Sequence, residues 1–267
     1  MDNRFIGVFD SGLGGLSAVK EIMDILPGES LIYFGDTGRV PYGTRSEETI
    51  IKYSREDIRF LKSHDVKLIV VACGTVSSVA LPQIANEAGV PIVGVVEAAA
   101  KAACEATKNN RIGIIGTSGT IKSNSYANEI LKTNPEAKTF QRACPLFVPL
   151  VENGHFDTPV AKLVVEEYLE EIRSAEVDTL ILGCTHYPLL KKVIKEFMGE
   201  NVTLIDSGAE IAKSIKRNYS HLLGDENRAG EYRYFVSDGI ETFENLASAF
   251  LRRDINGQVV KIDIEKY

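Results

Sequence analysis

The chain has 267 residues, and its 30 Lys and Arg against 37 Asp and Glu give a formal net charge of −7. This acidic balance argues against a nucleic-acid-binding surface, which needs clustered Lys and Arg. No apolar run reaches the roughly 20 residues of a membrane span, and the first residues lack a signal-peptide pattern. We therefore expect a soluble, cytoplasmic protein of one large or two compact domains.

Short β-branched runs alternate with helical patterns along most of the chain. In chain order, strands are predicted at residues 5–9, 31–34, 68–72, 92–95, 112–115, 179–182, 202–205 and 232–236. Helices are predicted at residues 16–26, after Ser46 as an N-cap, and at residues 98–106. The strand at residues 68–72 has no polar alternation, as expected when helices cover both of its faces. The pattern predicts an α/β protein built on parallel sheets.

Two segments of the first half recur in the second half, in the same order. Residues 4–12 are echoed by residues 111–119, and residues 68–75 are echoed by residues 179–185. We therefore expect two similar α/β domains related by a pseudo-twofold axis, with the active site in the cleft between them. The predicted division assigns residues 1–97 and 208–267 to the first domain and residues 98–207 to the second.

The four cysteines are expected to be free thiols, because the chain is predicted to be cytosolic and has no Cys-x-x-Cys pair. Cys104 and Cys144 are interpreted as packing residues. Cys73 and Cys184 instead follow the two echoed strands, and a helix start near a thiol lowers its pKa. Two thiols on opposite walls of a cleft can remove a proton from one face of a carbon and deliver one to the other face. That reaction inverts a stereocentre.

Other polar residues near these strand ends each have two interpretations. Asp10 and Ser11 form either an ordinary capped turn or a proton-steering and ligand-binding pair. His186 either polarises Cys184, two residues before it, or is a structural imidazole. Glu152, taken alone, is typical of a surface carboxylate.

The spacing of residues argues against a dinucleotide-binding loop and against a zinc site. Residues 113–119 are glycine-rich after a strand but lack the G-x-G-x-x-G order of a dinucleotide loop. Cys184 with His186 lacks a second ligand pair at zinc spacing, so no metal site is predicted. The Tyr42–Gly43 segment by itself indicates only a loop.

Four segments together give the sequence a specific likeness, over nearly its whole length, to the glutamate racemases of the aspartate/glutamate racemase superfamily. They are residues 9–17, residues 33–37 with 39–43, residues 144–152 and residues 182–190. The resemblance implies cofactor-independent interconversion of L- and D-glutamate, which supplies D-glutamate for bacterial peptidoglycan. It also implies a homodimer whose only other partner is the small-molecule substrate.

The resemblance further implies roles for individual residues. Cys73 takes the α-proton from D-glutamate and Cys184 takes it from L-glutamate. Asp10 and His186 assist the neighbouring thiols, and Glu152 supports His186. The residues at substrate-binding positions are Asp10, Ser11, Tyr42, Gly43, Gly74, Thr75, Thr185 and His186.

The chain departs from the family pattern at two places. Gly74 stands where an Asn is usual, so a side-chain amide is missing from the substrate site. Losing one hydrogen bond to a charged group costs about 1.5–3 kcal/mol if nothing compensates. Residues 97–99 read Glu-Ala-Ala in place of Glu-Pro-Gly, a change expected to affect the domain junction more than the chemistry.

Three rival functions have distinct signatures. A racemase of another acidic amino acid, such as aspartate, would differ in its preferred substrate. A nicotinamide-dependent oxidoreductase would bind a dinucleotide and would not need both thiols. A non-catalytic amino-acid-binding protein would keep its affinity after both thiols were removed.

Overall fold

Two separate parallel sheets organise the computed structural model, which describes residues 2–267. The first has the order β10-β9-β2-β1-β3-β4 and the second the order β6-β5-β7-β8. The strands of the first sheet are β1 (Ile6–Asp10), β2 (Leu31–Gly35), β3 (Leu68–Val71), β4 (Ile92–Gly94), β9 (Tyr232–Val236) and β10 (Val259–Lys261). Those of the second are β5 (Arg111–Gly116), β6 (Lys138–Ala143), β7 (Thr179–Leu182) and β8 (Thr203–Asp206). The predicted α/β class with parallel sheets is confirmed.

Helices cover the faces of both sheets, as parallel sheets require. Around the first sheet they are α1 (Leu16–Ile25), α2 (Glu47–Lys62), α3 (Gly74–Val79), α4 (Leu81–Ile84) and α12 (Ile240–Leu251). Around the second they are α6 (Ser118–Lys122), α7 (Ser125–Thr133), α8 (Phe147–Glu152), α9 (Pro159–Ser174) and α10 (Lys191–Met198). Helices α5 (Val95–Ala106) and α11 (Ser207–Asn218) pack against each other, and α11 also packs against α1. Short 3₁₀ turns lie at Tyr42–Thr44, Ala85–Glu87, Tyr187–Leu190, Ser220–Leu222 and Ile264–Lys266.

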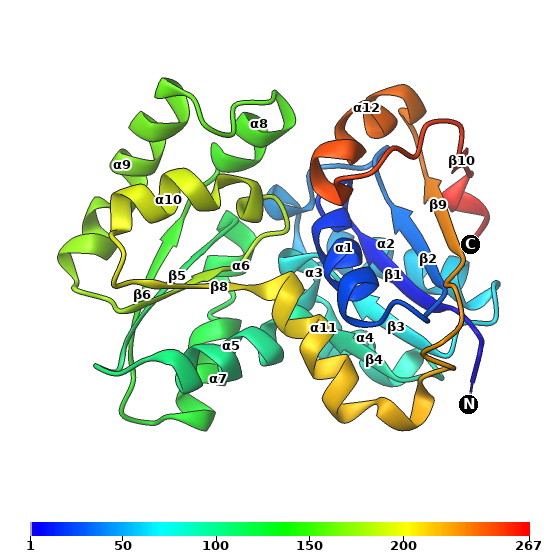
Figure 1. Ribbon diagram of the computed structural model, residues 1–267, viewed down its shortest axis with the longest axis horizontal. Coiled ribbons are helices and arrows are strands. Elements are labelled where there is room, and N and C mark those ends of the chain that lie inside the picture. The colour runs from blue at the N-terminus through cyan, green and yellow to red at the C-terminus, as the bar shows by residue number, and fades with distance from the viewer. Residues whose placement is uncertain (1) are drawn as a thin grey trace.

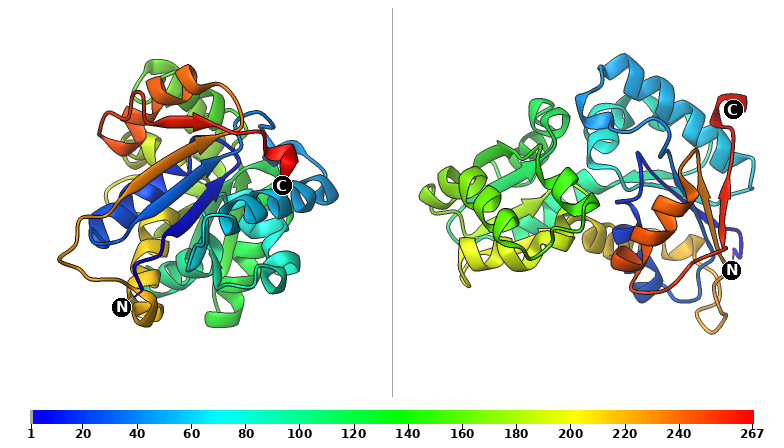
Figure 2. Two further views of the ribbon diagram at one scale, coloured as in Figure 1. Left: turned by 90° about the vertical axis from the view of Figure 1, so that its right-hand side faces the viewer. Right: turned by 90° about the horizontal axis from the view of Figure 1, so that it is seen from above.

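The two sheets share one strand order over four positions. In the first, β1 lies between β2 and β3, with β4 beyond β3; in the second, β5 lies between β6 and β7, with β8 beyond β7. The echoed sequence segments correspond to β1 with β5 and to β3 with β7. Figure 1 and the right-hand view of Figure 2 show the two sheets in separate lobes. This common topology supports an origin of the two halves by duplication.

The last part of the chain returns to the first lobe. Strands β9 and β10 extend the first sheet beyond β2, and α12 packs against α1 (Figure 1). The expectation that residues beyond about 207 pack onto the first half is confirmed. The exact division at residues 97/98 and 207/208 stays a prediction.

Most elements lie where the periodicity predicted them, since all eight predicted strands are found within one residue at each end. Ser46 caps α2 by accepting a hydrogen bond from the Thr49 amide at 3.3 Å. Strands β6 and β10 were not predicted. Both are edge strands, and β6 carries Lys, Thr, Gln and Arg, so neither has the apolar run of a buried strand. Across residues 2–267, no helix is long and apolar enough to cross a membrane.

Candidate active site

A cavity of about 250 Å³ lies between the two lobes. Its wall includes ten of the eleven residues that the sequence predicted for the site: Ser11, Tyr42, Gly43, Cys73, Gly74, Thr75, Glu152, Cys184, Thr185 and His186. The eleventh, Asp10, lies directly behind this wall, within hydrogen-bonding distance of Gly12 and Thr185. The volume suits a ligand smaller than a typical drug molecule.

The topology explains why these residues meet. Asp10 ends β1 and Cys73 follows β3, its parallel neighbour, so both lie at the carboxyl edge of the first sheet. Thr117 follows β5 and Cys184 follows β7, at the same edge of the second sheet. Ligands of open α/β sheets bind at this edge. Because the two lobes face each other here, Cys73 and Cys184 line one cavity from different halves.

Cys73 is buried beside a carboxylate, a setting that favours the thiol form. Its Sγ lies 3.6 Å from Ser11 Oγ, to which it can donate a hydrogen bond. Burial and the nearby Asp10 carboxylate raise the pKa of Cys73 to about 12, against the opposing effects of the Val76 amide and Ser11. The free protein therefore holds Cys73 as an acid at neutral pH. The predicted lowering of its pKa by the helix start is outweighed by burial.

Cys184 is part of a polar chain with His186 and Glu152. Its Sγ lies 3.9 Å from His186 Nδ1, and His186 Nε2 lies 3.0 Å from Glu152 Oε1. Burial lowers the pKa of His186, but the hydrogen bonds with Cys184 and Glu152 outweigh burial and raise this pKa to about 10. Since its side chain is only 7% exposed, the imidazole is held by these two partners rather than by water. Glu152 is therefore not the isolated surface carboxylate of the simpler interpretation.

Two hydroxyl contacts join the halves beside the thiols. Thr185 donates to Asp10 Oδ1 at 3.4 Å, and the Thr75 and Thr117 hydroxyls lie 2.9 Å apart. Asp10, the last residue of β1, corresponds to Gly116, the last residue of β5, so the second wall has no carboxylate at this position. Burial raises the pKa of Asp10, while the nearby His186 acts to lower it. The two walls are thus alike in backbone layout but differ in charge.

Gly74 marks a close backbone approach between the walls. A Cβ atom at this position would lie 2.2 Å from the Gly183 carbonyl oxygen. The sequence showed only that an amide was missing here. The structure adds a steric reason for glycine, because in this arrangement no side chain fits between the two cysteine-bearing loops.

The sequence did not identify several wall residues. Thr117 and Ser118 line the cavity, and their correspondence to Ser11 and Gly12, which follow β1 as they follow β5, is a signal that could have found them. Cys144 is fully buried in the apolar core, as its interpretation as a packing residue requires, but it also lines the cavity. All four cysteines are free thiols, as expected.

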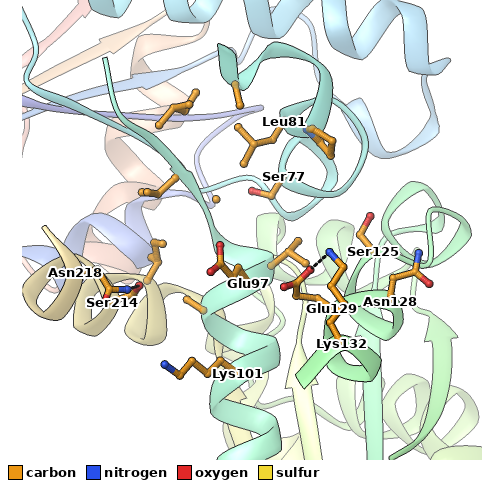
Figure 3. Close-up of a pocket in the computed structure, with 18 of the residues that line it drawn as sticks. Ser77, Leu81, Glu97, Lys101, Ser125, Asn128, Glu129, Lys132, Ser214 and Asn218 are labelled. Atoms are coloured by element: carbon orange, nitrogen blue, oxygen red, sulfur yellow. Dashed lines mark hydrogen bonds and ion pairs between the residues drawn. The ribbon is translucent and has the colours of Figure 1, made fainter. Parts of the chain in front are cut away.

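A second cavity of about 460 Å³ lies between α5, α7 and α11 (Figure 3). It contains neither Cys73 nor Cys184. Glu97 and Ala98 line it, so the departure from the family pattern at residues 97–99 falls at the junction of the halves, as predicted. Within residues 2–267, no three His, Cys, Asp or Glu side chains gather as metal ligands in either cavity or elsewhere.

Comparison with known proteins assigns the chain to a family. The family model of Asp/Glu/Hydantoin racemases matches residues 7–215. The chain belongs to this family of racemases.

Within this family, the curated proteins to which the chain is similar include glutamate racemases from several bacteria. A glutamate racemase from Geobacter metallireducens is 48% identical over 98% of this chain and 97% of its own. One from Chlorobaculum tepidum is 51% identical over 94% of this chain and 93% of its own.

Solved structures of racemases also superpose on the protein. A glutamate racemase from Francisella tularensis, crystallised in complex with D-glutamate, superposes with a TM-score of 0.92 at 37% identity, covering 100% of both chains. An aspartate racemase homologue from Pyrococcus horikoshii has a TM-score of 0.60 at 18% identity, covering 81% of this chain and 99% of its own, which shows the fold alone.

Proposed function

We propose that this protein interconverts L- and D-glutamate by two-base proton transfer between Cys73 and Cys184, without a cofactor. The observation that carries the proposal is the pair of thiols lining one small cavity from opposite halves. A racemase needs a base on one face of the α-carbon and an acid on the other, and this arrangement supplies both.

The surroundings of the two sulfur atoms support different starting roles. Cys73, with its raised pKa, enters the cycle as the acid. Cys184, with the His186–Glu152 pair behind it, enters as the base. Cys184 removes the α-proton of L-glutamate, and Cys73 delivers its own proton to the opposite face. Product release then leaves the protons exchanged, and the same groups act in reverse on D-glutamate.

The reaction also needs stabilisation of negative charge next to a carboxylate that is already anionic. The hydroxyls of Ser11, Thr75 and Thr185 line the cavity and can donate hydrogen bonds to that carboxylate. Donors fixed in a site that excludes water stabilise developing charge more than water does. Asp10, adjacent to Thr185, steers proton transfer on its side of the cavity.

The family resemblance extends the proposal to the cell. D-Glutamate made here would enter peptidoglycan synthesis in the cytoplasm, and the enzyme would act as a homodimer. The identities of 42–51% to glutamate racemases support glutamate rather than aspartate as the substrate.

The test uses the purified protein with no added cofactor and follows optical rotation with each enantiomer of glutamate and of aspartate. We expect racemisation of both glutamate enantiomers and at least about a hundredfold lower kcat/KM for aspartate, since a misplaced charged group loses about 1.5–3 kcal/mol per contact. Preference for aspartate would refute the substrate, and strict dependence on pyridoxal phosphate or a metal would refute the mechanism. Tight glutamate binding that persists without turnover after loss of both thiols would instead indicate a binding protein.

A further inference from the structure

A buried group of charged residues lies behind the Tyr42–Gly43 wall of the active-site cavity. The Arg39 guanidinium contacts three carboxylates: Asp36 Oδ2 at 2.6 Å from Nε, Asp57 Oδ1 at 3.2 Å from Nη2, and Glu56. The Asp36 and Asp57 side chains are 0% exposed. One guanidinium therefore faces three acids, which leaves an excess of negative charge where burial makes it costly.

The Tyr42 hydroxyl connects the two fully buried acids. It donates a short hydrogen bond to Asp36 Oδ2, and its oxygen lies 3.3 Å from Asp57 Oδ2. A phenol has a single hydrogen to donate. If Tyr42 donates that hydrogen to Asp36, its contact with Asp57 is a good hydrogen bond only when Asp57 donates to the phenol oxygen.

The other partners of the two acids fix which one holds the hydrogen. Asp36 accepts at both oxygens, from Arg39 and Tyr42 at Oδ2 and from Ser237 Oγ at Oδ1, 2.8 Å away. Each Asp36 oxygen therefore accepts a hydrogen bond, as the oxygens of an ionised carboxylate do. Asp57 accepts from Arg39 at Oδ1 only, which leaves Oδ2 free to be protonated. Burial, and then the neighbouring Asp36 charge, hold the pKa of Asp57 well above its usual range.

We propose that Asp57 carries a proton at neutral pH, and that the resulting chain from Asp57 to Tyr42 to Asp36, braced by Arg39, positions the Tyr42–Gly43 wall for substrate. Asp36, Arg39 and Asp57 are positioning residues, because they reach the cavity only through Tyr42. They belong to segments far apart in sequence, since Asp36 follows β2 and Asp57 lies on α2. The charged and titratable groups that face Asp57 are Asp36, Arg39, Tyr42 and Glu56.

The same substitution at the two buried acids tests the proposal. In Asp57→Asn, the amide oxygen can accept from Arg39 and the amide nitrogen can donate to Tyr42, which reproduces a protonated Asp57. In Asp36→Asn, the amide nitrogen either faces the Arg39 and Tyr42 donors or takes the place of the oxygen that accepts from Ser237, so one of the accepted hydrogen bonds is lost in either orientation. Both sites are equally buried, so each variant is the control for the other.

We expect Asp57→Asn to keep KM for glutamate within about twofold of wild type, and Asp36→Asn to raise KM by about tenfold or more, with a smaller change in kcat. This expectation rests on the proposed function, because it takes glutamate as the ligand of the wall. A KM raised equally by both substitutions, or by Asp57→Asn alone, would overturn the proposed chain.

Two further measurements do not depend on catalysis. The infrared spectrum of the full-length protein at neutral pH should contain a carbonyl band of a protonated carboxylic acid that Asp57→Asn removes. In urea unfolding, wild type should lose stability relative to Asp57→Asn as pH rises above about 4, since the unfolded Asp57 ionises there and the folded one does not. If Asp57→Asn leaves the infrared band unchanged, Asp57 is ionised and the proposal is wrong. If the band is lost in a protein that shows no racemase activity, the proposed function fails while the protonated Asp57 stands.

Discussion

Gly74 offers a direct test of how closely the two walls of the cavity must approach. A Cβ atom there would lie 2.2 Å from the Gly183 carbonyl oxygen, whereas ordinary contact begins near 3.4 Å. In Gly74→Ala the two cysteine-bearing loops must therefore separate by about 1 Å, and a misplacement of that size costs on the order of a hundredfold in rate. We expect kcat to fall by about this factor in Gly74→Ala. Gly74→Asn, which restores the residue usual in the family, should be no better.

Racemisation of glutamate followed by circular dichroism measures this effect in both directions. Because the two enantiomers are equally stable, kcat/KM must fall by the same factor from either side, which checks the data internally. Gly119→Ala is the matched control, since its Cβ would lie 3.2 Å from the Gly43 carbonyl oxygen across the same interface. That substitution should change kcat by less than about threefold, because a shift of a few tenths of an ångström relieves the contact. A Gly74→Ala enzyme as active as the Gly119→Ala control would refute the steric argument.

Two other substitutions probe the charges of the structure. Glu152→Gln should lower the pKa of His186 from about 10 toward its usual value, so the alkaline limb of the kcat/KM profile should move to lower pH. The stability advantage of wild type over Glu152→Gln should be largest below about pH 6.5 and disappear as pH rises toward 10. An alkaline limb of the kcat/KM profile that stays at the same pH would contradict the contact between Glu152 and His186. Lys67→Met should cost about 3–5 kcal/mol in urea unfolding, because it leaves the buried Glu29 carboxylate, 2.6 Å from Lys67 Nζ, without its partner. Since Lys67 precedes β3, at the edge away from the cavity, kcat/KM should stay within about twofold of wild type; a large loss of activity without destabilisation would count against this placement.

The fold was largely predictable because buried parallel strands leave a strong local signal. Residues 68–71 and 179–182 are apolar at nearly every position, and the structure buries both strands on each face. Strand β6 lacks that signal, because an edge strand pairs on one side only and tolerates polar residues such as Gln141 and Arg142. Its strand conformation depends on pairing with β5, and a local sequence pattern does not show which segments pair.

Part of the candidate site could likewise be predicted from the sequence and part could not. Residues at the ends of echoed strands, such as Cys73 and Cys184, could be located from the repeat and the rule that ligands bind at carboxyl edges. The contact between Gly74 and Gly183 could not be predicted from the sequence, because it depends on how the two halves pack against each other. The charge states could not be read from the sequence either. The raised pKa of Cys73 comes from burial and from Asp10, 63 positions earlier in the chain.

Incorporation of solvent deuterium at the α-carbon of glutamate tests the two-thiol mechanism most directly. L-Glutamate and, separately, D-glutamate are converted by the wild-type protein in deuterium oxide, and early samples of each enantiomer are analysed for label at the α-carbon. A different thiol acting on each face predicts deuterium in the newly formed enantiomer and almost none in the remaining starting enantiomer, and Cys73→Ala and Cys184→Ala should each abolish conversion. Equal labelling of both enantiomers from the first turnovers, or full conversion by either variant, would contradict the account.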